Sequence, residues 1–414
     1  MIHPWLILTR KIKLIILPLI SAVLTAVYVE MDKFLLTKFI PDPFAFSFIS
    51  LWLGSIALII FMFIMITPLK RGQRLGEYLD PNFRAIIIPK GGLLYWILIA
   101  AISGAVSTFT YFQIISLSSP SLVIPFSKLI IVYLIVLESM SDRDAPTIIE
   151  VQSIILILTG IFLMAVGDVA FNPLTIAIVL GPYNISGVVF TVALRNAKKR
   201  LYMNQRVDSL NIRLWVLLLN SVFTSIIFAP FIITPTGIGY LSTLTPTLVL
   251  LIIVDMMAAT FASITYIRAL GVAKMSIVNS ILAFTVILGI PFTLLGNAII
   301  PGGFGTVNLT GIYGMLTFIG ASLIMVGIIT IAITQVKGYL LIYLDGGAEP
   351  ILKKLMKVKG LTKVSAVSGE AMLIAELKIR SLGKAYRKIV TELEKITGIK
   401  TVRTLTSIKE WEKL

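Results

Sequence analysis

The chain opens with two long apolar stretches, LIILPLISAVLTAVYVEMDKFLLTKF at 14–39 and FAFSFISLWLGSIALIIFMFIMI at 44–66. An α-helix needs about 20 apolar residues to cross the roughly 30 Å of hydrocarbon in a bilayer. Both stretches reach this length, and both are too long to be strands of a membrane barrel. They therefore predict two transmembrane helices joined by a short loop.

Further apolar segments of this kind continue to about residue 335. Hydrophobic residues make up 57% of the chain, charged residues 14%, and the mean hydropathy of +0.98 lies outside the range of soluble domains. The sequence predicts an all-α polytopic membrane protein with ten spans, at 14–39, 44–66, 93–115, 119–138, 147–167, 173–194, 211–233, 247–267, 275–297 and 311–335.

Basic residues gather in alternate connections between these spans. The connections near 40–43, 116–118, 168–172, 234–246 and 298–310 contain only Lys38, at an edge. By the positive-inside rule both termini are expected in the cytoplasm, with the protein in the cell membrane. This topology and contact with anionic lipid explain most of the net charge of +16, so no nucleic-acid partner is predicted.

Residue types needed for several other functions are missing. The chain has no cysteine, which excludes disulfides, thiol catalysis and zinc–thiolate sites, and its one histidine, His3, precedes the first span. No nucleotide-binding loop, metal-ligand set or nucleophile–base set occurs. The sequence predicts neither an enzyme nor a bound cofactor or metal, and no removable signal peptide marks the N-terminus.

Two stretches, 111–167 and 266–327, have similar layouts. Each begins with a tyrosine at the end of one span and finishes in a glycine-bearing helix, LTGIFLMAVG at 158–167 and FIGASLIMVG at 318–327. Five spans separate the copies, so halves at about 14–167 and 173–335 would form an inverted repeat, with a substrate site near the midplane. The alternative is a chance likeness between apolar helices.

Four ionisable residues lie inside the expected spans at about the same depth, roughly 12–16 Å from the outer face at 1.5 Å per residue. They are Glu30, Lys33, Lys128 and Asp255. Glu30 and Lys33 share a helical face, whereas Asp32 points elsewhere. Charges at this depth are costly unless they pair or face water, so the four are expected to approach one polar cavity.

These charges allow two interpretations. They form ion pairs that fix helix packing, or Glu30 and Asp255 alternate between pairing with a lysine and carrying a proton. Neutral side chains that would complete such a pathway are Tyr111, Gln113, Tyr183, Asn184 and Asn279. Ordinary interhelical hydrogen bonds are the alternative role for each of these five.

Two segments carry a family likeness: VEMDKFLLTKFIPDP at 29–43, and YFQIISLSSPSLVIPFSKLIIVYLIVLES at 111–139 followed by GIFLMAVG. Over about 1–335 the chain resembles the EamA type of the drug/metabolite transporter superfamily. The usual Trp-Gly of the first span is replaced by Thr25 and Ala26. The resemblance implies a 5+5 inverted-repeat transporter of small metabolites, with a cavity walled by spans 1, 3, 4, 6, 8 and 9.

The composition changes after Gln335, where apolar residues begin to alternate with polar ones. Residues 336–414 predict a separate cytoplasmic domain with the order βαββαβ, the ferredoxin-like arrangement. The segments VKGLTKVSAVSGEAMLIAELKI and ITGIKTVRTLTSIKEW resemble the effector-sensing domain of Lrp/AsnC-type regulators. That resemblance implies dimerisation through the sheet and a ligand loop at Ser368, Gly369 and Glu370, although the family's acidic position is Met372 here.

The predicted function is a secondary transporter, exporting amino acids or related small polar metabolites and coupled to protons. The tail is predicted to sense a ligand or to dimerise. Partners are membrane lipid, the substrate, and a second copy bound through the tail or through spans 5 and 10, whose glycines permit close contact. The alternative is a membrane receptor that signals through its tail without transporting.

Overall fold

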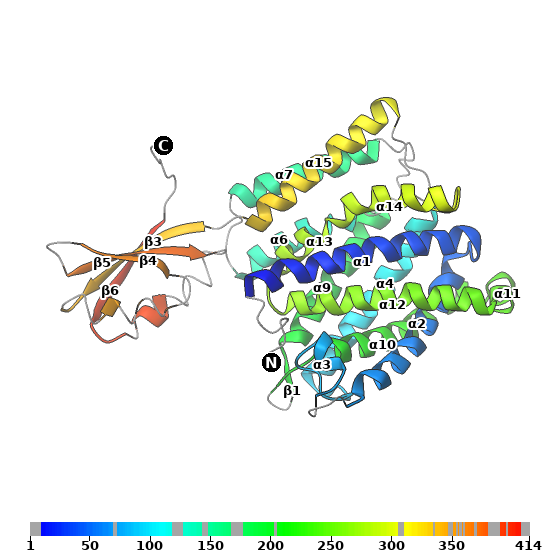
Figure 1. Cartoon of the computed structure of the whole chain (residues 1–414), viewed down its shortest axis with the longest axis horizontal. Coiled ribbons are helices and arrows are strands. Elements are labelled where there is room, and N and C mark those ends of the chain that lie inside the picture. The colour runs from blue at the N-terminus through cyan, green and yellow to red at the C-terminus, as the bar shows by residue number, and fades with distance from the viewer. Residues whose placement is uncertain are drawn as a thin grey trace. The chain divides into compact units, whose positions relative to one another are not determined.

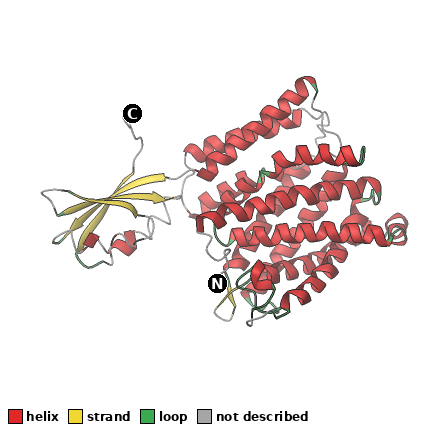
Figure 2. Cartoon of the chain, in the orientation of Figure 1, coloured by secondary structure: helices red, strands yellow, loops and turns green. Residues whose placement is uncertain are grey.

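The computed structural model divides into two compact units, Met1–Ile135 with Glu150–Ala332, and Val136–Ile149 with Ile333–Leu414. The first unit is helical and the second contains a sheet (Figure 2). The residues that the structure describes are 10–68, 73–117, 127–142, 148–166, 177–202, 205–304, 310–333, 336–346, 351–352, 355, 358, 361–367, 371–379, 390–394 and 396–406.

Long helices dominate the first unit (Figure 1). The described helices, long and short, are α1 Arg10–Lys38, α2 Pro43–Ile66, α3 Gly76–Leu79, α4 Gly92–Leu117, α6 Ile130–Asp142, α7 Ile148–Val166, η2 Val179–Tyr183, α9 Asn184–Lys199, α10 Ser209–Ile232, α11 Pro235–Ser242, α12 Pro246–Leu270, α13 Met275–Leu282, α14 Thr285–Ile299 and α15 Gly311–Ile333, of which α6 extends into the second unit. A short hairpin, β1 Leu201–Tyr202 and β2 Gln205–Arg206, joins α9 to α10.

Several of these helices begin at a capping side chain followed by proline. Asp42 accepts hydrogen bonds from the amides of Phe44 and Ala45 at 2.8 and 3.3 Å, and Pro43 is the first helical residue of α2. Thr245 caps α12 in the same way before Pro246. A proline loses nothing at the first helical position, because its missing N–H would have no partner there. The short loops therefore set where these spans start.

Seven described helices are long and apolar enough to cross a membrane. They are Ile15–Lys38, Pro43–Ile66, Gly92–Ser116, Ser209–Ile232, Pro246–Leu270, Met275–Ile299 and Gly311–Thr330, and they coincide with seven of the ten expected spans. The expected spans at 119–138, 147–167 and 173–194 correspond to α6, α7 and η2–α9, which border residues outside the description. The chain is a multi-pass membrane protein; ten spans and the inverted repeat remain predictions.

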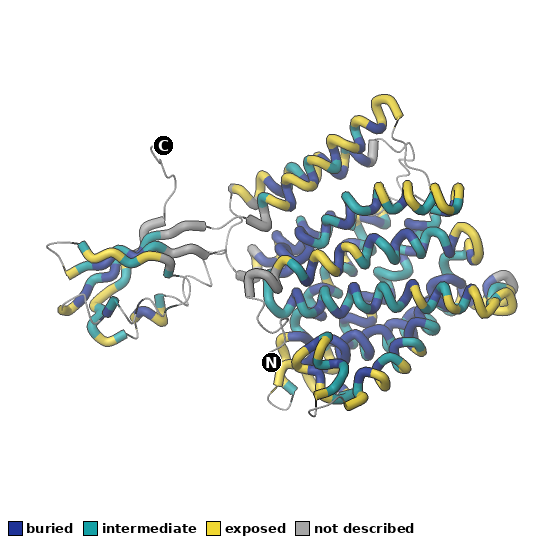
Figure 3. Tube along the Cα trace, in the orientation of Figure 1, coloured by how far each residue is buried: buried dark blue, intermediate teal, exposed yellow. Residues whose placement is uncertain are grey.

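Apolar side chains both fill the unit and cover its outside. Leu35, Phe46 and Met62 are fully buried in the main core. Phe318 and Ile312 on α15 are 74% and 64% exposed, and exposed residues run along that helix in Figure 3. Outward-facing apolar residues on a span long enough for a bilayer are what contact with lipid requires.

Helices α7 and α15 lie side by side and meet at two glycines (Figure 1). A Cβ built on Gly160 would lie 2.5 Å from the backbone oxygen of Gly320, and one on Gly320 would lie 2.6 Å from that of Gly160. The two backbones thus touch within one chain. These glycines were predicted to form part of a dimer face, but their contact is intramolecular, and a dimer through spans 5 and 10 is not shown.

Replacing Gly320 with alanine is expected to destabilise the first unit by about 1–3 kcal/mol, because the added methyl group meets backbone that cannot move aside cheaply. The measurement is thermal unfolding in detergent. Gly239→Ala is the matched control, since no atom lies within 4 Å of its built Cβ. An unchanged melting temperature for Gly320→Ala would contradict the close α7–α15 contact.

The second unit contains a four-stranded antiparallel sheet in the order β4-β5-β3-β6, formed by β3 Val336–Leu344, β4 Leu361–Ala366, β5 Met372–Ile379 and β6 Ile399–Thr406. Leu340 and Ile342 alternate with half-buried residues on β3 and pack with Leu373 of β5. Described helical residues lie near Ile351 and near Leu393, between the strands as expected. The domain boundary at 335/336 and the Lrp/AsnC likeness stay predictions, and the proposed ligand loop at Ser368, Gly369 and Glu370 lies outside the described residues.

Candidate functional site

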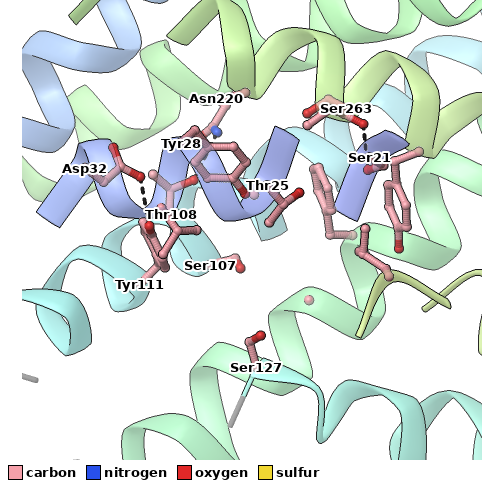
Figure 4. Close-up of a pocket in the computed structure, with 18 of the residues that line it drawn as sticks. Ser21, Thr25, Tyr28, Asp32, Ser107, Thr108, Tyr111, Ser127, Asn220 and Ser263 are labelled. Atoms are coloured by element: carbon pink, nitrogen blue, oxygen red, sulfur yellow. Dashed lines mark hydrogen bonds between the residues drawn. The ribbon is translucent and has the colours of Figure 1, made fainter. Parts of the chain in front are cut away.

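A cavity of about 300 Å³ lies inside the first unit (Figure 4). Its walls come from α1, α2, α4, η2, α9, α10, α12, α13 and the residues 127–130. This volume is at the lower end of the range for small-molecule sites. Hydroxyl and amide side chains are frequent in the lining: Ser21, Thr25, Ser50, Ser107, Thr108, Ser127, Asn184, Thr191, Asn220, Ser263 and Asn279.

Helix α1 presents a polar stripe to the cavity. Ser21, Thr25, Tyr28 and Asp32 all line it, and their spacings of four, three and four residues place them on one face of a helix. Figure 4 shows the stripe facing Thr108 and Tyr111 of α4. Since α1 is otherwise a hydrophobic span, this stripe marks the side that faces the cavity.

Two buried carboxyl groups face each other in the wall, Asp32 from α1 and Asp255 from α12. Asp32 accepts a hydrogen bond from the Tyr111 hydroxyl at 2.8 Å and lies within hydrogen-bonding reach of Asp255. Neither carboxyl oxygen of Asp255 receives a hydrogen bond from another donor among the described residues. Two carboxylates can only accept, so a bond between them requires a proton on one of them.

Tyr28 lies near both the acid pair and a buried cation. Its hydroxyl is within electrostatic range of both Asp32 and Arg213. Arg213 belongs to the second turn of α10 and lines the cavity, and its Nε has no hydrogen-bond partner among the described residues. Lys128 also lines the cavity and is buried. The cavity therefore contains buried groups of both charges.

A chain of hydrogen bonds joins three helices in another part of the wall. The Tyr266 hydroxyl on α12 lies 2.9 Å from Oγ1 of Thr191 on α9. It also receives a hydrogen bond of 3.0 Å from Nδ2 of Asn279 on α13. Interhelical hydrogen bonds of this kind hold spans together in the absence of a hydrophobic driving force.

A single π-helical turn positions Tyr183 and Asn184. The turn, η2, contains Pro182, which lacks an N–H, and the Val179 carbonyl accepts hydrogen bonds from both the backbone amide and the side-chain Nδ2 of Asn184, the latter at 2.7 Å. Turns of this type occur mostly inside α-helices, often at functional sites. Both Tyr183 and Asn184 line the cavity.

The structure brings together six of the nine pathway residues predicted from sequence. Cavity-lining predictions are Lys128, Asp255, Tyr111, Tyr183, Asn184 and Asn279. Glu30, Lys33 and Gln113 are not among the lining residues. Glu30 accepts a hydrogen bond of 2.7 Å from Thr293 on α14, and Lys33 donates one of 2.8 Å to the Ile115 carbonyl.

Asp32, Tyr28 and Arg213 were not predicted as site residues. Asp32 was assigned to a different helical face from Glu30 and Lys33, and its face is the one that meets the cavity. The polar spacing along α1 was the available signal. Arg213 stands near the start of α10, next to a connection where basic residues are expected for reasons of topology.

A second buried charge cluster joins loops at the ends of α3, α9 and α10, outside the candidate spans. Asp80 Oδ2 lies 2.6 Å from Lys198 Nζ and accepts a hydrogen bond of 2.7 Å from the Ser209 amide. Burial opposes ionisation of Asp80, but the Lys198 ammonium and these hydrogen bonds outweigh it and lower the pKa of the carboxyl. The contact links the α2–α4 connection to the α9–α10 connection.

Asp208, beside this cluster, makes stability depend on pH. Burial, reinforced by nearby Asp80, raises the pKa of Asp208 to about 6 despite hydrogen bonds from Asn211. The folded state thus binds this proton more readily than the unfolded state, where an aspartate titrates near 4. Stability from this group is fully present below about pH 4 and is lost as the pH rises through about 6.

Between pH 7 and pH 5 the wild type should therefore gain stability relative to Asp208→Asn, by at most about 1.4 kcal/mol per pH unit. The measurement is thermal unfolding in detergent across that range. Asp42→Asn is the matched control, because it replaces the corresponding cap of α2. Parallel pH profiles for wild type and Asp208→Asn would contradict the assignment.

Together these features define a multi-pass membrane protein with a cavity between its helices that is lined in part by polar and charged side chains. Residues 12–166 match the EamA-like transporter family, which confirms the likeness seen in the sequence over that part of the chain. The match and the apolar helices support a transporter of the drug/metabolite type rather than an enzyme.

The other comparisons add little. No curated protein matches the chain. One similar solved structure, named only "Crystal structure of protein", is 14% identical, covers 75% of this chain and 96% of that one, and has a TM-score of 0.45. At that TM-score the likeness supports no conclusion about fold or function.

Proposed function

We propose that this protein is a secondary transporter that exports amino acids or related small polar metabolites. The observation that carries the proposal is the cavity between the helices, whose lining includes charged, hydroxyl and amide side chains from widely separated parts of the sequence. Its volume suits a small metabolite, and its hydroxyl, amide and charged groups suit a polar one. Polar sites at this position in a bundle of spans mark substrate pathways.

Proton coupling is assigned to Asp32 and Asp255. The groups that face this pair are Tyr111 and Tyr28, with Tyr183, Lys128 and Arg213 in the same cavity wall. No basic side chain among the described residues lies within ion-pair distance of either carboxylate. Two carboxylates this close resist simultaneous ionisation, so release of their shared proton would accompany rearrangement of α1 against α12.

The decisive experiment is counterflow in proteoliposomes that contain the purified chain. The vesicles are loaded with an unlabelled metabolite, and the labelled metabolite is added outside. A transporter exchanges the label without an energy source. Binding without exchange would instead support the alternative function, a membrane receptor. Each of the twenty amino acids is a suitable first probe, since each carries both an ammonium and a carboxylate group.

The orientation in the membrane is also proposed. Both termini are placed in the cytoplasm of the cell, on the side where basic residues gather. Arg74, Arg84 and Lys90 precede α4, and Lys198 and Arg200 end or follow α9. A reporter fused after Leu414 should be active inside the cell, and activity confined to the outside would reverse the assignment.

The second unit is proposed to modulate transport or to dimerise the protein. Support comes from its independent sheet and core, in which Leu340 and Leu355 are fully buried. Deletion of 338–414 should leave exchange intact while changing its rate, its response to metabolites or the oligomeric state measured by light scattering. Unchanged values for all three would remove this role.

A further inference from the structure

Four ionisable side chains in the cavity wall are almost completely buried. Asp32 and Asp255 are 3% and 1% exposed, and Lys128 and Arg213 are 6% and 8% exposed. In the described residues no carboxylate lies within 4.0 Å of the Lys128 or Arg213 nitrogens, so the acids and the bases do not neutralise each other. Buried charges without partners are expensive, and a ligand with matching charges removes that cost.

The acid pair forms one end of the charged lining. Asp255 has both carboxyl oxygens without a donor, and Tyr111 and Tyr28 approach Asp32. Carboxylates beside tyrosine rings offer an ammonium group both ionic hydrogen bonds and the negative faces of the rings. An ammonium of the ligand would replace the shared proton as the donor between the two carboxyl groups.

Arg213 forms the other end. It stands near the start of α10, whereas the next cavity residues of that helix are Leu217 and Asn220. Nδ2 of Asn220 lies 3.5 Å from Oγ1 of Thr108. Thr108 is one turn away from Tyr111 on α4. A planar guanidinium is suited to hold a carboxylate through two parallel hydrogen bonds. Tyr28 is within electrostatic range of both Arg213 and Asp32, and all three line one cavity.

We propose that the cavity recognises a zwitterion in a fixed orientation, with its ammonium group at Asp32 and Asp255 and its carboxylate at Arg213. This inference rests on the proposed transport function and names the residues that select the substrate. A zwitterion adds no net charge of its own and satisfies both ends, whereas a simple amine or a simple acid satisfies only one end. Arg213 and the acid pair are therefore specificity-determining residues.

The test combines ligand analogues with matched variants, using binding to the full chain in detergent measured by calorimetry. The probes are the twenty amino acids, followed by the decarboxylated amine and the deaminated acid of the amino acid that binds best. The variants are Arg213→Gln and Asp255→Asn. Their controls are Arg200→Gln, an exposed arginine, and Glu30→Gln, a buried acid outside the lining.

The wild type should bind the amino acid about 10- to 100-fold more tightly than either analogue, the range expected for a hydrogen bond to a charged group. Arg213→Gln should weaken the amino acid by a similar factor and leave the amine unchanged. Asp255→Asn should weaken the amino acid and the amine and leave the deaminated acid unchanged. Binding of the amino acid to the two control variants should stay within twofold of the wild type.

Equal losses for all three ligands in Arg213→Gln, or an amine that binds the wild type as tightly as the amino acid, would overturn the inference. So would a panel of twenty amino acids of which none binds. Counterflow keeps this failure apart from failure of the transport function. Exchange of some other metabolite with no binding of the panel refutes only the zwitterion site. The predicted binding pattern without exchange refutes only transport.

Discussion

Asp255→Asn is expected to abolish proton-driven accumulation of substrate in proteoliposomes, while counterflow at saturating substrate continues. Asparagine has nearly the shape of aspartate, but it cannot release a proton in the accessible pH range. The proton-coupling role requires that the Asp32–Asp255 pair gain and lose a proton in each cycle. A variant that cannot do so still moves substrate down its gradient and no longer uses the pH gradient.

The expected loss is large, at least tenfold in accumulation driven by an imposed pH difference. Asp32→Asn should have the same effect, because the two carboxyl groups act as one unit. Glu30→Gln is the control that distinguishes this assignment from the one made from sequence, where Glu30 and Asp255 were the two candidates for carrying the proton. Glu30 contacts Thr293 and not the cavity. If Glu30→Gln alone removes the pH response, the coupling residue is Glu30.

Folding defects do not imitate this result. Asp255 is buried beside another carboxyl group and has no donor among the described residues. Replacing one of two buried carboxyl groups that face each other is expected to maintain or raise stability, because their burial and mutual repulsion are unfavourable and the asparagine amide can still donate to Asp32. The melting temperature of Asp255→Asn should therefore equal or exceed that of the wild type. A lower one would show that the carboxylate has a structural partner.

The membrane spans were predictable because length and hydropathy are local properties. The spans at 44–66 and 247–267 are α2 and α12 to within a few residues, and a cap with a following proline marks both starts. The tail strands were predictable for the same reason, since alternation shows in any short window. The α7–α15 contact was not, because nothing local says that Gly160 meets Gly320 and not a second copy of the chain.

The site was only partly predictable, because the depth of a charge in the membrane does not show whether its side of the helix faces the cavity. Lys128 and Asp255 stand out in apolar surroundings and do line the cavity. Glu30 stands out equally, yet a buried acid can be accommodated by a single hydroxyl such as that of Thr293. Which side of a helix faces the cavity is decided by how that helix packs against the others. Sequence distance also hides the pairing of Asp32 with Asp255, which depends on α1 lying against α12 (Figure 1).

Lys198→Met is expected to destabilise the first unit by about 3–5 kcal/mol, the cost of removing one partner of a buried ion pair. Lys198 and Asp80 are both buried, at 7% and 2% side-chain exposure, and their charged atoms lie 2.6 Å apart. Without the ammonium, the Asp80 carboxylate keeps only amide donors. Methionine retains the length and apolar stem of lysine, so the loss reports the charge and not a cavity.

The pH dependence of that loss identifies its cause. Because the pKa of Asp80 is lowered in the folded protein, its contribution is present above about pH 4 and is lost as the pH falls through the folded value. The loss of stability in Lys198→Met, measured by thermal unfolding, should therefore be largest at neutral pH and shrink on acidification, as Asp80 takes up a proton.

Arg84→Met is the control. It breaks the Arg84–Glu77 bridge, where Arg84 is 56% exposed, and should cost under about 1 kcal/mol. Lys198→Met and Asp80→Asn share one interaction, so the double variant should lose less than the sum of the single losses. Strictly additive losses, or a deficit that is constant with pH, would show that the two charges do not stabilise each other.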